Sequence, residues 1–283
     1  MWPNYTHPVY GTSPWIAGGA AVGIGAALFV SRDDGPLWRR IAAGLILATC
    51  AYLGARALGE LGVSGLAGVA SFSWLRPSGQ IRLSGAVVGV LVGMPICHAT
   101  VLGNFRLLRT ADVVAVGLAA SEPIFRLGCF ATGCCFGRVS HLVGSVTFPA
   151  GSPPWQRHVV LGLISPFAHA SLPVYPLQLY FCALALLCLV AVLEMMRHRS
   201  HMPGLAALVF VAMHEWGKFW LETLREPAFP GDHSLRIPAL IVATLATLAL
   251  LATLAVHASA TSDSRSRIAR TSTRRPEQPA EGF

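Results

Sequence analysis

Arginines flank a glycine-rich segment in the middle of the chain. Arg126 opens this segment and Arg138 closes it, and Gly128, Gly133 and Gly137 lie between them. Arginine binds phosphate through a planar fork of donors, and glycine lets the backbone bend tightly or approach a ligand closely. The pattern is typical of a phospholipid head-group site. An interfacial loop whose arginines reach toward the membrane surface fits the same composition.

Three cysteines lie within this segment, at positions 129, 134 and 135. They are candidates for a structural disulfide, for reactive thiols beside arginine, or for metal ligands together with His141. The spacing of the cysteines is not a usual zinc pattern, so metal binding ranks last of the three. A disulfide or structural thiol ranks first, and a reactive thiol second.

A second group of ionisable residues lies near position 220. Its members are His214, Glu215, Lys218, Glu222 and Arg225. Helical spacing places residues 215, 218, 222 and 225 on one face. Charge inside an apolar segment is costly and usually faces a partner or a cavity. Two interpretations remain open: a salt-bridge ladder that holds the helix in its bundle, or the polar wall of a cavity that faces Arg126.

A third segment, Pro173–Tyr180, is expected to open a helix at Pro176. Gln178 and Tyr180 are candidates for binding a head group, although an aromatic anchor at the membrane surface is the default role for Tyr180.

The elements that carry these residues are apolar. Only 12% of the residues are charged, against about 25% in soluble domains, and 54% are hydrophobic. We therefore predict an all-α integral membrane protein. Apolar stretches of about 20 residues cross a bilayer as helices. Seven such spans are expected, at residues 14–30, 41–58, 84–102, 112–125, 176–193, 203–219 and 237–256.

Basic residues set the predicted orientation. Arginines follow the first, third, fifth and seventh spans, so these connections are expected in the cytoplasm and the N-terminus outside. A large extracytoplasmic loop region, about residues 126–175, then lies between helices four and five. Residues 1–259 form the predicted membrane domain, and residues 260–283 a disordered basic tail in the cytoplasm. Residues 1–13 lack the basic start of a signal peptide, so the first span is expected to be retained.

The net charge of +8 reflects this tail as well as the loops. A tail beside a membrane helix is expected to contact anionic lipid rather than nucleic acid. Nucleic acid is therefore not an expected partner.

In order and spacing, these motifs resemble those of the bacterial prolipoprotein diacylglyceryl transferase family across most of the membrane region. The matching segments are Ala111–Asp112, Arg126–Phe130, Phe136–Ser140, Val146–Pro149, Pro173–Tyr180 and Glu222–Pro227. The resemblance implies a seven-helix enzyme of the bacterial inner membrane. Such an enzyme moves diacylglyceryl from phosphatidylglycerol to the cysteine thiol of a lipoprotein precursor. It implies neither a metal nor an organic cofactor.

The resemblance also implies roles for single residues. Arg126, with Arg138 or Arg225, would bind the phosphate, and Glu222 would orient Arg126 or Lys218. Gln178 and Tyr180 fall in segments that match the family's. His214 or a cysteine thiolate would accept the proton.

The chain departs from the family at several matched positions. Cys129 stands where the family has Asn, Cys134 where it has Glu, and His214 and Lys218 where it has Tyr and Arg. Ser84–Ala86 corresponds to a His-Gly-Gly segment, so Ser84 replaces the histidine. Two cysteine replacements within one loop are expected to act as a unit. Between a Cys129–Cys134 disulfide and two reactive thiols, we favour the disulfide. The alternative to a divergent transferase is a membrane paralog that only binds lipid or performs thiol redox chemistry.

Overall fold

The structure is a computed structural model that describes residues 9–33, 35–70, 83–102, 107–197, 202–226 and 236–272. The described residues are helical, with a few isolated β-bridges and no strand. The α-helices are α1 (Val9–Val30), α2 (Leu37–Ala70), α3 (Leu83–Cys97), α4 (Leu107–Thr132), α5 (Pro153–Val160), α6 (Leu177–Arg197), α7 (Leu205–Leu221) and α8 (Arg236–Ser272). A π-helical turn, His98–Leu102, continues α3, and a 3₁₀ turn, Glu222–Leu224, continues α7.

Apolar length confirms a membrane protein. Four helices are long and apolar enough to cross a bilayer, at Leu37–Leu58, Leu108–Thr132, Leu177–Arg197 and Ala239–Ser259. Pro14–Val30 and Val88–Val101 are shorter apolar helices. The helix α8 runs on to Ser272, past the boundary that we predicted at residue 259. The fold is therefore an all-helical membrane bundle, and the division into a membrane domain and a tail stays a prediction.

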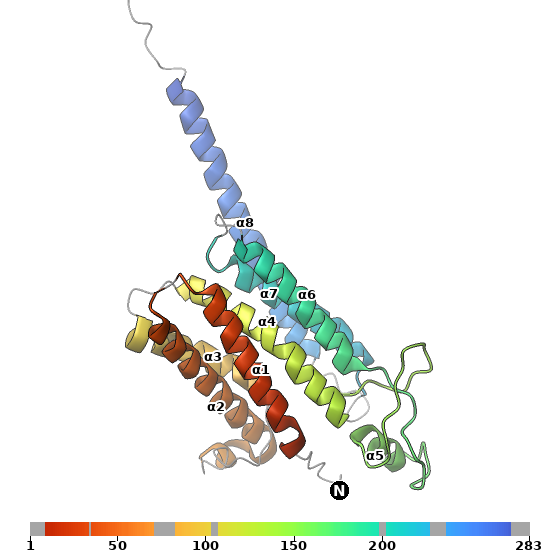
Figure 1. Cartoon of the computed structure of the whole chain (residues 1–283). Coiled ribbons are helices and arrows are strands. Elements are labelled where there is room, and N and C mark those ends of the chain that lie inside the picture. Colours follow the sequence, from red (N-terminus) through yellow and green to blue (C-terminus); the bar gives the residue numbers. More distant parts are fainter. Residues whose placement is uncertain are drawn as a thin grey trace, which may run out of the picture.

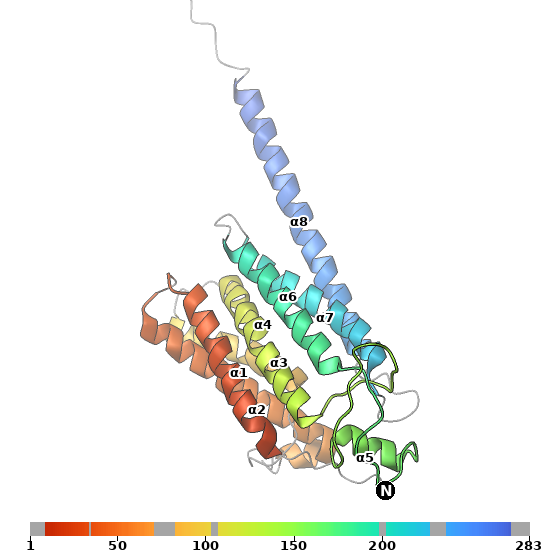
Figure 2. The ribbon, with the colours of Figure 1, turned by 45° about the vertical axis from the view of Figure 1, so that its right-hand side comes forward.

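The long helices lie side by side and run in alternate directions (Figure 1). The helix α5 and the connection from α4 to α6 cover one end of this bundle, the end at which α1 begins (Figure 2). We call residues 133–176 the cap. Its chain is joined by single antiparallel bridges, such as Val146 with Val174 and Pro149 with Ala170. The large connection predicted between the fourth and fifth long helices is therefore an ordered layer over the end of α4.

Glycines bring α2 and α3 into backbone contact. A side chain on Gly85 would place its Cβ 2.2 Å from the carbonyl oxygen of Gly54, and one on Gly89 would lie 2.0 Å from that of Cys50. Gly85 and Gly89 are four residues apart, which is the spacing of small residues at close membrane-helix contacts. Real side chains at either position would force these two helices apart.

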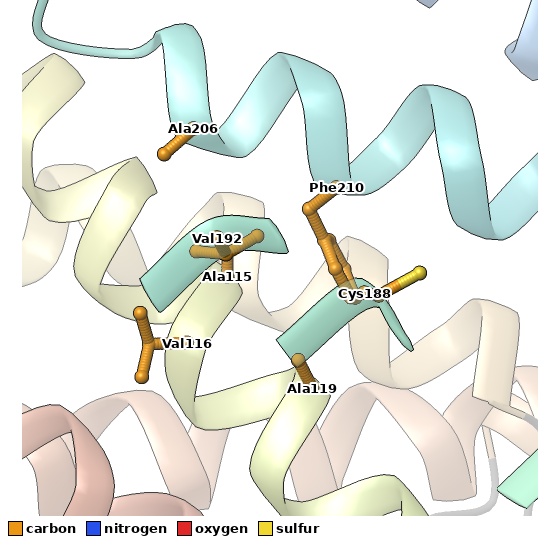
Figure 3. Close-up of a cluster of buried hydrophobic side chains, with 7 residues drawn as sticks. All are labelled: Ala115, Val116, Ala119, Cys188, Val192, Ala206 and Phe210. Atoms are coloured by element: carbon orange, nitrogen blue, oxygen red, sulfur yellow. The ribbon is translucent and has the colours of Figure 1, made fainter. Parts of the chain in front are cut away.

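The packed core lies where α4, α6 and α7 meet (Figure 3). All of its buried members except Phe210 are small or medium-sized. The buried members of the cluster are Ala115, Val116, Ala119, Cys188, Val192, Ala206 and Phe210. Alanine and valine leave room for close approach, and Phe210 fills the space between helices. This cluster fixes α7 against α4, and both helices carry residues of the candidate site.

A buried carboxylate fixes the start of α7. Asp112 of α4 accepts hydrogen bonds from the backbone N–H of Gly204, at 2.8 Å, and of Ala207, at 2.9 Å. The first N–H groups of a helix lack partners within it, and an acidic side chain there is favoured by the helix dipole. Asp112 therefore fixes the register of α7 on α4.

Candidate functional site

Arg126 is buried in α4 and held on two sides. Its Nε and Nη2 donate to Oε1 of Glu122, at 2.9 Å and 2.8 Å, one helical turn earlier. Its guanidinium carbon lies 4.1 Å from the ring centre of Phe181, on α6. Paired hydrogen bonds and a stacked aromatic ring leave the side chain little freedom. The result is a cation in a fixed position near the capped end of the bundle.

Hydrogen bonds link Arg126 to α7. Nε2 of His214 lies 2.9 Å from Oε2 of Glu122, and Nδ1 lies 3.0 Å from Oε1 of Glu215. Nζ of Lys218 lies 3.6 Å from Oε2 of Glu215. We call these five residues the charge network. Basic and acidic groups alternate along it, so each buried carboxylate has basic partners.

This network occupies both nitrogens of His214. Each ring nitrogen lies within hydrogen-bonding distance of one carboxylate oxygen, so neither nitrogen is free for a further partner. His214 must therefore release one carboxylate before it can accept a proton.

The predicted helical face does not extend to Arg225. This residue lies beyond the end of α7 and pairs with Gly137 of the cap. The helix α7 ends at Leu221, one 3₁₀ turn follows, and Arg225 has extended backbone angles of φ −70° and ψ 143°. Pro227 follows closely in the sequence, and a proline disfavours helical geometry in the residue before it. The α-helix therefore ends before it can place residues 215, 218, 222 and 225 together on one face.

The extended backbone lets this segment pair with the glycine-rich loop. Arg225 forms an antiparallel bridge with Gly137, and the N–H of Arg138 donates to the carbonyl of Leu224 at 2.8 Å. A side chain on Gly137 would lie 2.6 Å from Cβ of Tyr175 and 2.8 Å from the carbonyl oxygen of Leu224. Gly137 is therefore the residue that allows this contact.

Arg126 and Arg225 are each held by a carboxylate of their own. We predicted that Glu222 would orient Arg126 or Lys218. The structure instead pairs Glu222 with Arg225, whose Nη2 donates to Oε1 at 2.8 Å and whose Nε pairs with Oε2. Arg126 takes Glu122, which lies on its own helix. The salt-bridge ladder is present at its two ends, Glu215–Lys218 and Glu222–Arg225.

The three cysteines meet at the junction of α4 and the cap. Cys129 is buried on the last turn of α4, and its carbonyl accepts a hydrogen bond from the N–H of Cys134 at 3.0 Å. Gly133 and Cys135 have positive φ values, 70° and 57°. We call Cys129, Cys134 and Cys135 the thiol group, because their sulfur atoms all lie within 4.8 Å of one another.

All three cysteines are free thiols in the structure, rather than the Cys129–Cys134 disulfide that we favoured. The left-handed turn at Cys135 brings a third sulfur to the pair, so the arrangement is a group of three.

Cys135 is the most acidic thiol of the thiol group. Its pKa lies well below the ordinary value, because the Cys129 and Cys134 thiols hydrogen-bond to its sulfur. The positive charges of Arg225 and Arg126 lower this pKa further. A reactive thiol beside arginine was the second-ranked prediction for all three cysteines. The sequence did not single out Cys135, because the turn that brings it near both arginines is visible only in the structure.

The sequence of the chain matches the prolipoprotein diacylglyceryl transferase family over residues 20–258. The chain belongs to this family. Curated proteins named phosphatidylglycerol–prolipoprotein diacylglyceryl transferase are similar to it. One from Clostridium perfringens, number 2 of that name, is 27% identical over 141 residues, which are 50% of this chain and 48% of the relative. One from Sinorhizobium medicae is 29% identical over 153 residues, 53% of this chain and 48% of the relative. The chain spans about half the length of the curated relatives it matches.

The family motifs do not all reach the same place in the fold. Gln178 is fully buried, and its Nε2 donates to the carbonyl of Cys134 at 2.6 Å. Tyr180 is half-buried on the first turn of α6, and Arg138 is exposed on the cap. Ser84 lies on the first turn of α3, and its side chain lies outside the described residues. Of the expected phosphate ligands, Arg126 and Arg225 are therefore partly or fully enclosed, and Arg138 is not.

Sequence reasoning missed two residues that hold Arg126. Neither Glu122 nor Phe181 was assigned a role from the sequence. The signal for Glu122 was present, because an acid four residues before an arginine, within an apolar helix, predicts an internal ion pair. Phe181 carried no such signal, since its contact depends on how α6 packs on α4.

Proposed function

We propose that this chain is a divergent diacylglyceryl transferase of the bacterial cytoplasmic membrane. Its donor would be phosphatidylglycerol and its acceptor the cysteine thiol of a lipoprotein precursor. Family membership and the names of the relatives support the reaction class. The observation that carries the proposal is the buried, doubly held Arg126, because an enclosed and oriented cation is what a lipid phosphate requires.

Arg126 keeps donors for a second anion. A guanidinium has five N–H groups, and Glu122 accepts from Nε and Nη2. Arg225, held by Glu222 beside the same loop, is the second cation available to a phosphate. Two fixed cations would stabilise the negative charge that develops on a departing phosphate without reorganising during the step.

The reaction exchanges one bond for another. The acceptor sulfur forms a bond to the glyceryl carbon that bears the phosphate, the carbon–oxygen bond to phosphate breaks, and glycerol phosphate leaves. The thiol proton passes to a base in the site. Two bases fit: His214, once substrate displaces one of its carboxylates, and a cysteine thiolate, with Cys129 and Cys134 as the sequence candidates.

We also propose the finer topology: seven spans, the N-terminus outside, the cap at the outer face and the C-terminus in the cytoplasm. The alternating run of the helices and the basic connections at the opposite end from the cap support it (Figure 1). A reporter fused after Arg275 should behave as cytoplasmic, and one inserted near Gly151 as external. The reverse result for either fusion contradicts this topology.

The decisive assay uses purified protein, phosphatidylglycerol with a labelled glyceryl group, and a peptide with a single lipobox cysteine. Label should appear on the peptide thiol. Arg126→Lys should abolish the transfer, because lysine cannot reproduce the paired hydrogen bonds to Glu122. Arg197→Lys is the matched control, since Arg197 forms an exposed pair with Glu194 at the far end of α6. No label on the peptide in the wild-type protein contradicts the proposal.

A second function is supported by the thiol group alone. Three thiols at one loop, two of them at matched family positions, favour a paralog that binds lipid and uses the thiols for other chemistry. Growth rescue separates the two functions. A transferase restores growth when the host's own transferase is depleted, and such a paralog does not.

A further inference from the structure

The thiol group has the geometry of a metal site. Its sulfurs lie within 4.8 Å of one another. Three thiolates at about 2.3 Å from a zinc ion in tetrahedral geometry are separated by roughly 3.8 Å. Small side-chain rotations therefore close the group around one ion. By sequence spacing alone metal binding ranked last, because the spacing does not show that the loop turns Cys135 toward Cys129.

The surrounding structure holds these sulfurs in place. Thr132 donates through Oγ1 to the sulfur of Cys134 at 3.5 Å, and Gln178 donates to the carbonyl of the same cysteine at 2.6 Å. Cys135 has a φ of 57°, a region that residues other than glycine seldom occupy. Such backbone strain persists when the surrounding contacts impose it, and it clusters at ligand sites. Hydrogen bonds around the ligands are typical of built metal sites.

The local charge also suits three thiolates. Three thiolates around a divalent ion leave a net charge of −1. Arg225 lies in hydrogen-bond contact with Cys135, and the charge of Arg126 also reaches this cysteine. Both arginines carry their own carboxylate partners, so the site is not dominated by positive charge.

We propose that Cys129, Cys134 and Cys135 bind one thiophilic d10 metal ion, such as Zn²⁺, through three thiolates, with one coordination position left open. Sulfur ligands select ions of this class over hard ions such as Mg²⁺ or Ca²⁺. Three metal–sulfur bonds form and three protons pass to water, with no change of oxidation state. With an ion bound, His214 is the proton acceptor that remains for the proposed transfer reaction.

The test uses the full-length protein, reduced, stripped of metal and kept in detergent, and titrated with Co²⁺. We expect one ion per chain, with sulfur-to-cobalt charge-transfer absorption and d–d bands of tetrahedral intensity. Zn²⁺ should displace the cobalt. Alkylation followed by mass spectrometry should show the exposed Cys135 thiol protected by Zn²⁺ and reactive without it.

Variants identify the ligands. Cys135→Ser and Cys129→Ser should each lower cobalt affinity at least 10-fold. Cys182→Ser is the matched control, because Cys182 is half-buried on α6, with its sulfur 3.9 Å from the carbonyl of Pro123, and should bind as the wild type does. Cys135 is exposed on a loop, so its variant should keep the fold, as the melting temperature will show.

Three results overturn the proposal: no charge-transfer band, undiminished cobalt affinity in Cys135→Ser, or zinc that leaves the Cys135 thiol reactive. The assay contains no lipid and no acceptor, so it does not depend on the proposed transferase function. Transfer without metal binding refutes this inference alone, and metal binding without transfer refutes the proposed function alone.

Discussion

The charge network and the cap place functional residues by different means. The network lies on the regular helices α4 and α7, and its members are joined side chain to side chain, from Lys218 to Arg126. The cap, with its junction to α4, is held mainly by backbone contacts and turns with positive φ, as at Gly133 and Cys135. Rigid helices can carry buried charge, because their own backbone groups are already satisfied.

The difference shows how each region tolerates divergence. Removing the charge of a network residue leaves a buried partner charge, and the replacement at Lys218 keeps the positive charge. A loop residue can change type when backbone bonds rather than its side chain hold the turn. The replacements at Cys129 and Cys134 lie at the junction, where the N–H of Cys134 bonds the carbonyl of Cys129. The departures of the chain from its family therefore fall in both regions, at Cys129 and Cys134 beside the cap and at His214 and Lys218 in the network.

The largest effect should come from Glu122→Ala, which breaks the network at its centre. Glu122 serves both Arg126 and His214, so its removal leaves two buried basic groups without their shared partner. Breaking a buried ion pair costs about 3–5 kcal/mol. We expect a large fall in melting temperature in detergent and no transfer activity. Glu122→Gln should be intermediate, since the amide oxygen still accepts a hydrogen bond.

Glu194→Gln is the control for this change. Glu194 forms an exposed pair with Arg197, three residues later on the same helix α6, and such pairs contribute about 0–1 kcal/mol. Equal destabilisation by Glu122→Ala and Glu194→Gln would show that the network does not hold α4 and α7 together.

The next largest effect should come from Gly137→Ala, at the junction of the two regions. The added methyl would meet Cβ of Tyr175 at 2.6 Å and the carbonyl oxygen of Leu224 at 2.8 Å. Overpacking of this kind costs about 1–3 kcal/mol, and here it pushes Arg225 away from the loop. We expect the rate of lipid transfer to fall more than the melting temperature, because the helices are not altered.

Gly25→Ala provides the comparison on α1. No atom lies within 4 Å of the position that its Cβ would take, so neither activity nor stability should fall. If Gly137→Ala is as active as Gly25→Ala, the contact between Arg225 and the loop is not needed for function.

Sequence reasoning predicted the network better than the cap, for a physical reason. Helical periodicity puts Glu215 and Lys218 on one face, and they do form a pair. The same periodicity extended to Arg225 was wrong, because the α-helix ends at Leu221. The contact of Arg126 with Phe181 and the meeting of three sulfurs depend on packing and on turn geometry. Neither has a period in the sequence, so no spacing rule reveals them.

A smaller effect tests the cap through pH. His158 of α5 is fully buried, and its Nδ1 accepts the N–H of Leu172 at 3.1 Å. Burial lowers the pKa of His158 below its ordinary value of 6.5, and the neighbouring charge of Arg157 lowers it further. The unfolded cap therefore binds a proton that the folded cap does not. Stability is fully present above about pH 6.5 and is lost as pH falls toward the folded pKa.

Limited proteolysis of the cap at several pH values measures this loss. Cleavage should increase below about pH 6.5 in the wild type. Replacing exposed His141 by Gln should leave that dependence unchanged, whereas His158→Gln should weaken it. A pH profile that is identical in His158→Gln and the wild type would mean that His158 is not the titrating group.

The smallest effect has the opposite sign, and it concerns Glu226, where the chain leaves α7 and meets the cap. Burial raises the pKa of Glu226 above its ordinary value of 4.5, and the charges of Arg157 and Arg138 only partly offset this. The folded protein then binds a proton that the unfolded chain has released. The stability that Glu226 contributes is present below pH 4.5 and is lost as pH rises through the pKa of Glu226 in the folded protein. At neutral pH the ionised carboxylate of Glu226 is therefore slightly destabilising, although its oxygen lies 3.9 Å from Nε of Arg157.

Glu226→Gln removes the buried charge and a weak ion pair together, so we expect a gain in stability of no more than about 0.5 kcal/mol at neutral pH. Denaturant titration of the purified protein at pH 5 and pH 7.5, with Glu194→Gln as the exposed control, measures it. A clear destabilisation at neutral pH would show that the pair with Arg157 outweighs burial, and that this corner of the cap is held by charge, as the membrane-level network is.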